Sequence, residues 1–234
     1  MLDSFAFHAG QMVVALLLDA LLGWPALVFA RIGHPVSWIG HVVSGLDRNW
    51  NRDALSPVLR RLAGVGVVLV VTGLAGGVGL GLCFLLPHNG LGVLAGGVLA
   101  WPLLAARSLY AHVLAVVQPL SAGDMPGARK AVSMIVGRDP NVLDSAGIAR
   151  AAAESLAENT SDGVVAPLFW GVLLGLPGLS AYPAINTMVS IIPNRPPPYR
   201  SFGSASARAA AAVNLLPSRS PRVVAPAPRG RTPG

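Results

Sequence analysis

The chain has 234 residues, of which 53% are hydrophobic and only 12% are charged, and its mean hydropathy is +0.60. This composition excludes an ordinary water-soluble domain and favours a protein that resides in a membrane. The formal net charge is +7, but the arginines lie in loops beside apolar runs rather than in an aromatic-interleaved patch. We therefore expect the lipid bilayer, and no nucleic acid, as a partner.

The first apolar stretch, residues 10–30, is long enough for one membrane crossing and carries Asp19 near its middle. An ionisable group at that depth marks a functional or interhelical site. The alternative is a helix that ends near Gly23-Trp24-Pro25 and leaves Asp19 close to an interface, and the sequence leaves both open. After Arg31, the segment that starts at His34-Pro35 has apolar residues at the helical period, which predicts an amphipathic helix at the membrane surface.

The clearest transmembrane helix is predicted over residues 62–86, which contain no charge. Gly73, Gly77 and Gly81 recur every four residues, and such a stripe of small residues favours close helix contact. Residues 91–106 are apolar again after a short turn. The whole stretch is therefore predicted to form a tight transmembrane hairpin.

Most acidic residues fall in a helical segment over about residues 107–162, which we expect outside the bilayer. A short helix is predicted over 124–136, and an Ala-rich helix from Asp144 to Glu158. The polar run 159–163 is predicted to break that helix and to cap the next one. A glutamate in a last turn opposes the helix dipole, so Glu158 is expected to carry a local cost that suggests function; a solvated elbow is the other interpretation.

The fold class predicted is an all-α polytopic membrane protein with three or four transmembrane or re-entrant helices. Residues 163–182 form either a broken span or a re-entrant helix pair. The arginines at 31, 48, 52, 60 and 61 place their loop, and with it residues 107–162, in the cytoplasm by the positive-inside rule. We expect one membrane-embedded domain over residues 1–219 and a disordered Pro/Arg-rich tail over 220–234.

Several blocks of the sequence together resemble one known family. They are LLLDALLGWP, HPVSWIG, the long block VGRDPNVLDSAGIARAAAESLAENTSDGVVAPLFW, and AINT at 184–187, with weaker echoes up to Pro217. The family is CobD/CbiB, the adenosylcobinamide-phosphate synthases, which are membrane amide synthases of cobalamin biosynthesis. The resemblance covers roughly residues 10–219.

The resemblance implies ATP-dependent amide formation between adenosylcobyric acid, a corrinoid, and aminopropanol or its phosphate, with Mg²⁺ required. It places the site on the cytoplasmic face of a bacterial inner membrane, with a homo-oligomer or other cobalamin enzymes as further partners. Mg²⁺ is usually held by one or two carboxylates plus phosphate oxygens. The residues expected to be catalytic and to hold the metal are Glu154, Glu158 and Asp162. Those expected to bind substrate are Arg138, Arg150, Asn159, Ser161, His34 and Asn186.

The sequence departs from the family pattern in its last quarter. Where members carry Asp-Ser-Met after Asn-Thr, residues 188–191 read Met-Val-Ser-Ile, and a later Arg-Leu-Asp-Asp becomes residues 208–211, Arg-Ala-Ala-Ala. Three expected acids are therefore absent, and members continue into a further apolar span. We expect a shortened or divergent member, and a non-catalytic membrane component that binds corrinoid or partner enzymes stays open beside the ligase. A transporter is a weaker third interpretation.

Overall fold

A computed structural model describes residues 2–136, 139, 142–192, 200–215 and 217, and these residues form helices joined by turns, without strands. This confirms the predicted all-α class. The predicted tail over 220–234 lies outside the described residues. The elements of the first half are α1 (Leu2–Leu22), α2 (Ala26–Ile32), α3 (Pro35–Trp50), α4 (Pro57–Leu85), α5 (Gly90–Ala100) and the 3₁₀ turn η1 (Trp101–Leu103). Those of the second half are α6 (Ala106–Ser121), α7 (Met125–Ser133), α8 (Ser145–Thr160), the π-helical turn η3 (Ser161–Val165), α9 (Ala166–Leu174), α10 (Leu176–Ile191) and α11 (Arg200–Asn214).

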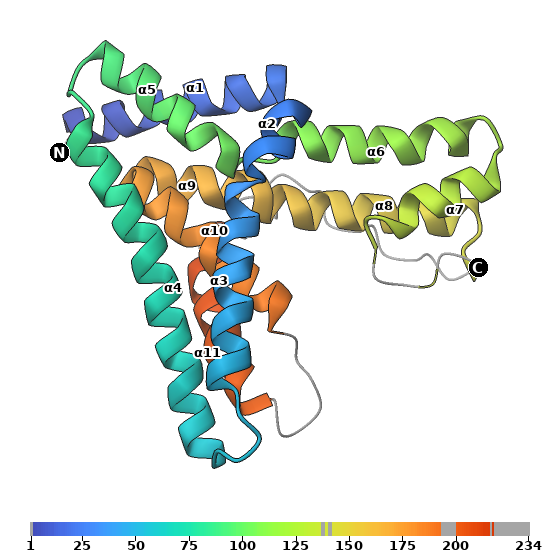
Figure 1. Cartoon of the computed structure of the whole chain (residues 1–234). Coiled ribbons are helices and arrows are strands. Elements are labelled where there is room, and N and C mark those ends of the chain that lie inside the picture. The colour runs from blue at the N-terminus through green and yellow to red at the C-terminus, as the bar shows by residue number, and fades with distance from the viewer. Residues whose placement is uncertain (1, 137–138, 140–141, 193–199, 216, 218–234) are drawn as a thin grey trace, which may run out of the picture.

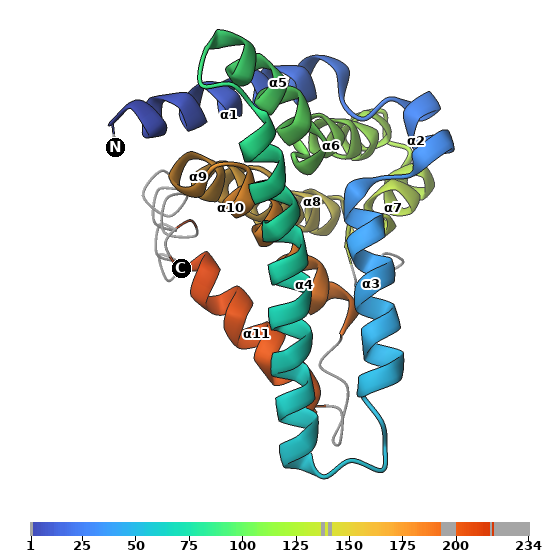
Figure 2. The same ribbon diagram turned by 60° about the vertical axis from the view of Figure 1, so that its left-hand side comes forward.

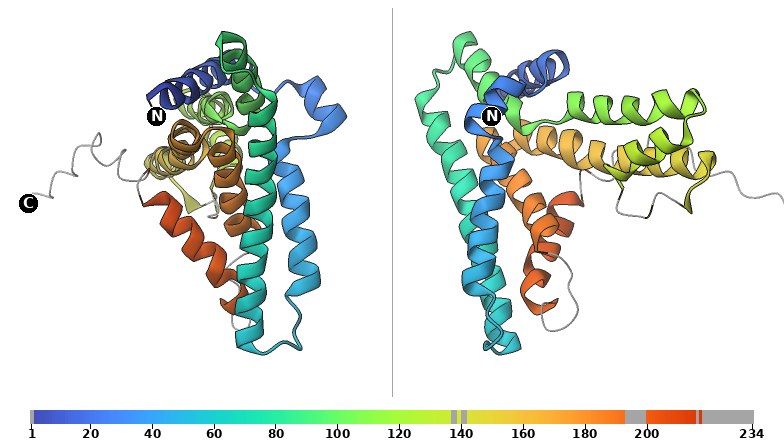
Figure 3. Two further views of the ribbon diagram at one scale, coloured as in Figure 1. Left: turned by 90° about the vertical axis from the view of Figure 1, so that its left-hand side faces the viewer. Right: turned by 45° about the vertical axis from the view of Figure 1, so that its right-hand side comes forward.

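The helices are arranged in three groups (Figure 1). Each group has its own apolar core. In the first group, α3, α4, α10 and α11 pack around Val67, Met188 and Phe202. In the second, α1 packs with α5 and the α9–α10 turn around Met12 and Leu179. In the third, α6, α7 and α8 form an arm that projects sideways from the other two groups, as the views in Figure 3 show.

Three helical stretches of the described chain are long and apolar enough to cross a membrane: Asp3–Leu22, Pro57–Leu85 and Gly90–Ser121. The first two correspond to the predicted spans. The third runs from α5 through η1 into α6, and so extends into the segment that was expected outside the bilayer. Exposed apolar side chains line these stretches, for example Leu69 (68% exposed) and Phe84 (82% exposed) on α4. Such surfaces are matched by lipid rather than by water.

The first span ends early, at Leu22, because Gly23 takes a positive φ of 60° and Pro25 follows. The alternative in which the helix ends at Gly23-Trp24-Pro25 is therefore the right one. Asp19 is nevertheless buried, with 3% exposure, and its Oδ2 accepts a hydrogen bond of 3.2 Å from the backbone N–H of Arg107. The last turn of α1 is thus joined to the start of α6.

The transmembrane hairpin predicted between residues 62–86 and 91–106 is wrong, because the second helix packs against a different partner. Helix α5 turns away from α4 and packs along α1 instead. A Cβ at Gly96 would overlap the side chain of Gln11, so only glycine allows this approach. The buried Gln11 amide then satisfies its N–H by donating to the carbonyl of Gly92 at 3.1 Å. One polar side chain on α1 therefore fixes where α5 lies.

The glycine stripe on α4 is also misassigned. A Cβ added at Gly73, Gly77 or Gly81 would meet none of the described atoms within 4 Å apart from those of the adjacent turns of α4 itself. The close contacts lie at other glycines: a Cβ at Gly64 would overlap the carbonyl of Phe202 on α11, and one at Gly79 the carbonyl of Leu176 on α10. Period-four spacing therefore identified glycines on the wrong face of the helix.

Candidate functional site

Helix α8 begins as predicted, at a side-chain cap. Asp144 Oδ1 accepts a hydrogen bond of 2.7 Å from the backbone N–H of Gly147. The buried residues Ile148, Ala151, Ala152 and Ser155 then face α6 and α7. The small alanines allow the arm to pack closely, and the Ser155 hydroxyl donates to the carbonyl of Ile135 at 2.7 Å. This pairing fixes the rotation of α8 and so the direction of its outward-facing acids.

The predicted helix break at residues 159–163 is wrong. The chain passes from α8 through η3 into α9 without interruption, and no side chain caps the start of η3. The extra residue of a π-turn lets the helix continue while its hydrogen-bond register shifts, and such turns are frequent at functional sites. Glu158 therefore lies inside a continuous helix rather than in a last turn, so the expected cost against the helix dipole does not apply.

The π-turn is held by the start of the arm. The backbone N–H of Ala105 donates to the carbonyl of Gly163 at 3.0 Å. A Cβ at Gly163 would lie 3.1 Å from the Ala105 Cβ, so a larger residue would disturb this contact. The register shift at η3 thus directs Asp162 toward the space between α1, α3 and α10.

That space is a cavity of about 650 Å³. It lies where the end of α1, the start of α3, η1, η3 and the middle of α10 meet. Its polar lining residues come from segments far apart in the sequence: Asp19, Trp24, His34, Ser37, Ser108, Asp162, Asn186 and Thr187. Three of the predicted site residues, His34, Asp162 and Asn186, are therefore brought together.

His34 is the N-cap of α3, and its Nδ1 accepts a hydrogen bond of 3.2 Å from the backbone N–H of Val36. The Trp24 ring packs edge-on against it, 5.4 Å between centroids. Burial lowers the pKa of His34, while the Asp19 carboxylate opposes this shift by attracting the charged form. A neutral imidazole with its proton on Nε2 therefore faces the cavity near neutral pH.

The pKa of Asp162 is shifted upward, in the opposite direction to that of His34. Burial raises its pKa, a hydrogen bond from Tyr182 lowers it, and the negative charge of Glu158 raises it. The carboxyl group is thus held in a less polar setting than Glu154 and Glu158, which are exposed on α8. Like-charged carboxylates one helical turn apart form a place that a cation would stabilise.

Two smaller hollows continue from the cavity along the arm. One of about 430 Å³ shares Ala105 and Ser108 with the cavity and reaches Asn159. The next, of about 320 Å³, shares Asn159 and is lined by Glu154 and Glu158. The Asn159 amide donates to the Ser155 carbonyl at 2.8 Å, which fixes it between the two hollows. The predicted acids therefore line one connected row of depressions.

The other predicted residues lie around this row. Arg150 is exposed on α8, and Ser161 is half-buried at the start of η3 without lining any of the three hollows. Arg138 lies outside the described residues. Among the residues that the structure describes, no three His, Cys, Asp or Glu side chains are grouped to hold a metal ion. The three-carboxylate metal site accordingly stays a prediction.

Sequence reasoning did not assign Tyr182, which is 2% exposed and donates to Asp162 Oδ1 at 3.2 Å. Nothing in the local pattern around Tyr182 indicates this role. Ser37 and Thr187 were also unassigned, although each belongs to a block that resembles the family. Asp19 was considered but not placed in the site.

Comparison with known proteins agrees with the resemblance. A family model described as CobD/Cbib protein matches residues 12–227. The chain is 56% identical over 211 residues to "Cobalamin biosynthesis protein CobD" of Rhodobacter capsulatus, and 44% identical over 207 residues to the protein of that name in Brucella suis. These matches cover 90% and 88% of this chain, but 66% and 63% of the two relatives, so the chain spans slightly less than two thirds of their length. No solved structure matches it.

Proposed function

Because the chain belongs to the CobD/CbiB family, we propose that it acts in cobalamin biosynthesis as a membrane amide synthase. The substrates proposed are adenosylcobyric acid and aminopropanol or its phosphate, with ATP as the activating reagent. We place the protein in a bacterial inner membrane with the site open to the cytoplasm. The observation that supports this most is the convergence of Asp19, His34, Asp162 and Asn186, one from each family-like block, on a single cavity.

The shape of the site suits a large substrate. A corrinoid is larger than the 650 Å³ cavity alone, but the row of hollows along the arm extends the site from Asp19 to Glu154. The aromatic ring of Trp24 and the apolar wall at Leu103 and Leu104 suit the flat corrin ring. The acids at the far end suit a phosphorylated substrate with its counter-ion.

Amide formation requires that a carboxylate be activated and that an amine lose a proton. Neutral His34 presents its Nε2–H to the cavity, because Nδ1 accepts the Val36 N–H, and it is placed to donate a hydrogen bond to the carboxyl oxygen of the substrate. The amine proton would leave with the phosphate that departs from the activated carboxyl group. Glu158 and Asp162, which lie close enough for one charge to raise the pKa of the other, are the carboxylates that would hold Mg²⁺, with Glu154 beside them. The bound ion would neutralise phosphate charge during activation. Arg150 and Asn159 are proposed to bind the substrate at the outer end.

The proposal is tested by supplying purified protein with adenosylcobyric acid, aminopropanol phosphate and Mg-ATP and detecting the amide by mass spectrometry. We expect product, and a loss on the order of 10²-fold in Glu158→Gln, since one electrostatic group is removed. Asp124→Asn is the matched control, because Asp124 only caps α7 and asparagine caps equally well. Near-normal turnover in both Glu154→Gln and Glu158→Gln would refute the metal assignment.

A non-catalytic role is the second candidate. It is favoured by the apolar residues Val189, Ala210 and Ala211 at positions where the family pattern carries acids. Corrinoid binding without any amide product, in protein whose helical content is intact, would support this role instead.

A further inference from the structure

A further hollow shares no lining residue with the candidate site and is independent of the proposed function. It has a volume of about 290 Å³ and is formed between α4 and α11. Figure 2 shows α11 beside the lower half of α4 and leaving it at an angle. The contact of Gly64 with the Phe202 carbonyl holds the two helices together where the hollow begins.

The walls of the hollow combine two guanidinium groups with an apolar surface. Arg61 and Arg208 come from the two helices, and Val65, Val68 and Leu69 form the apolar wall. Val65 and Leu69 are exposed, and both belong to a helix long and apolar enough to cross a membrane. A groove that combines cationic groups with an apolar wall is complementary to an anionic amphiphile.

Within the part of the chain that the structure describes, the two arginines of the hollow have no acidic partner. The neighbouring Arg60 is 2% exposed and pairs with Asp53 at 2.9 Å. In contrast, neither Arg61 nor Arg208 has a hydrogen bond or an ion pair with another residue, and no acidic side chain lines the hollow among the described residues. Guanidinium groups bind phosphate oxygens through paired N–H donors.

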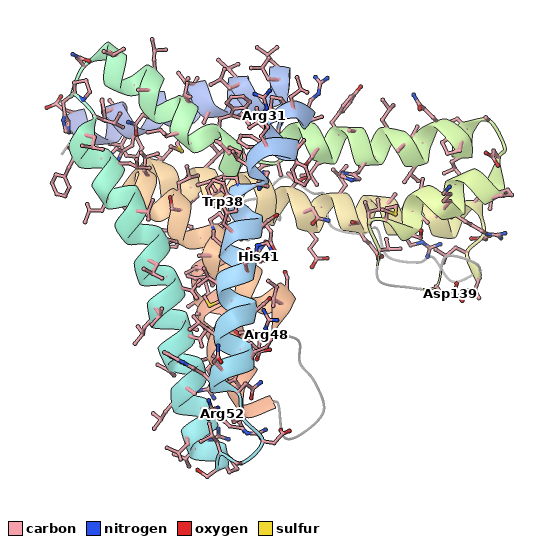
Figure 4. All side chains as sticks on the ribbon, in the orientation of Figure 1. Arg31, Trp38, His41, Arg48, Arg52 and Asp139 are labelled. Carbon is pink, nitrogen blue, oxygen red and sulfur yellow. The ribbon has the colours of Figure 1, made fainter. Side chains whose placement is uncertain are left out.

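The position of the hollow matches the level of lipid headgroups. Arg61 lies in the second turn of α4, so the helix enters its uncharged stretch directly after it. Arg48 and Arg52 lie at the same end of the bundle, near the lower end of α3 (Figure 4). A basic end next to an apolar span is the usual location for the headgroups of anionic lipids.

We propose that the hollow between α4 and α11 binds an anionic phospholipid, with Arg61 and Arg208 on the phosphate and an acyl chain along Val65 and Leu69. Lipid bound there would join α11 to the span that it accompanies. The zwitterionic lipid phosphatidylcholine carries a compensating cation and should bind less well.

The test is native mass spectrometry of the full chain in neutral detergent, titrated with phosphatidylglycerol or phosphatidylcholine. We expect preferential retention of phosphatidylglycerol. Its affinity should fall about fivefold in Arg61→Gln or Arg208→Gln and about thirtyfold in the double variant, because each arginine contributes about 1 kcal/mol to binding. Arg31→Gln on α2 is the matched control and should bind normally.

Three results would overturn the proposal: equal retention of the two lipids, normal retention by the double variant, or competition by glycerol phosphate at concentrations similar to those of the lipid, which would indicate a site for free phosphate. Circular dichroism establishes that each variant is folded. If the double variant fails to fold, Arg61→Lys with Arg208→Lys retains the charge and should retain most of the preference for phosphatidylglycerol.

Discussion

The Tyr182 hydroxyl oxygen lies 3.2 Å from Asp162 Oδ1 and 2.7 Å from Asn214 Oδ1, so that one phenol joins η3 to α11. A phenol has a single hydrogen and cannot donate to both oxygens. Both contacts are satisfied when the Asn214 amide is turned so that its NH₂ donates to the phenol and the phenol donates to Asp162. The orientation of Asp162 in the cavity is therefore set by residues on two other helices.

Replacing Tyr182 by phenylalanine should alter the pH dependence of catalysis. The hydrogen bond from Tyr182 lowers the pKa of Asp162, so its loss should raise that pKa further and shift the acidic limb of the pH–rate profile to higher pH. We also expect a loss of about 1–2 kcal/mol of stability, because buried polar groups lose a partner. Tyr110→Phe, at an exposed phenol, is the control. An unchanged acidic limb would mean that Tyr182 does not act through Asp162.

Asp162→Asn should separate activity from stability. Burial raises the pKa of Asp162, which means that the folded protein disfavours the carboxylate. The charged carboxylate therefore destabilises the folded protein above the folded pKa. This destabilisation is relieved as the pH falls toward 3.8, the ordinary pKa. At pH 7 asparagine removes the charge, so the melting temperature should be unchanged or higher. Amide synthesis should fall on the order of 10²-fold or more.

Asp144→Asn is the control for Asp162→Asn, since asparagine is an equally good cap for α8. It should change neither activity nor melting temperature. A large loss of stability in Asp162→Asn would indicate that Asp162 has a structural rather than a functional role.

The sequence predicted helices and their period well, because apolar periodicity and caps are local. Asp144 as a cap, the amphipathic α3 and the uncharged stretch of α4 after Arg61 all follow from residues within a few positions of one another. The partner of α5 did not follow, since it depends on the fit of Gly96 against Gln11, which is 85 residues away. Nor does any local signal distinguish a π-turn at Ser161–Val165 from a break, because the run is polar and contains glycine in both cases.

The site was predicted only in part, because some of its contacts depend on long-range packing that leaves no local signal in the sequence. The resemblance selected His34, Asp162 and Asn186 from three separate blocks, and the fold brings them to one cavity. The pairing of Tyr182 with Asp162 and Asn214 depends on how α10 crosses both η3 and α11. That crossing is set by close contacts such as Gly79 against the Leu176 carbonyl, which no spacing rule encodes.

Two glycine substitutions on α4 should have opposite effects. In Gly64→Ala the new Cβ overlaps the carbonyl of Phe202, a backbone atom that cannot move away easily. We expect a destabilisation of about 1–3 kcal/mol, as for other overpacked contacts. Gly77→Ala meets open space and should be neutral or up to about 1 kcal/mol stabilising, because alanine favours the helix. Thermal unfolding followed by circular dichroism in detergent measures both. A destabilised Gly77→Ala would instead show that this face packs against a second chain.

His34 should make the protein sensitive to mild acid. Its Nδ1 accepts the Val36 N–H, so protonation at that nitrogen breaks the cap of α3, and burial lowers the pKa of His34 below its ordinary value of 6.5. The unfolded chain then binds a proton at a higher pH than the folded protein does. Stability should therefore fall as the pH drops from about 6.5 through the folded pKa.

His34→Asn keeps a side-chain cap but cannot titrate, so the difference in melting temperature between this variant and the unmodified protein isolates the effect. We expect the melting temperature of His34→Asn to rise relative to that of the unmodified protein as the pH is lowered from 8 to 5. His41→Asn, on the exposed side of α3, reports the general effect of removing a histidine. A difference that stays constant over this range would show that His34 is equally solvated in the folded and unfolded states, and would remove the basis for assigning it as a neutral hydrogen-bond donor in the cavity.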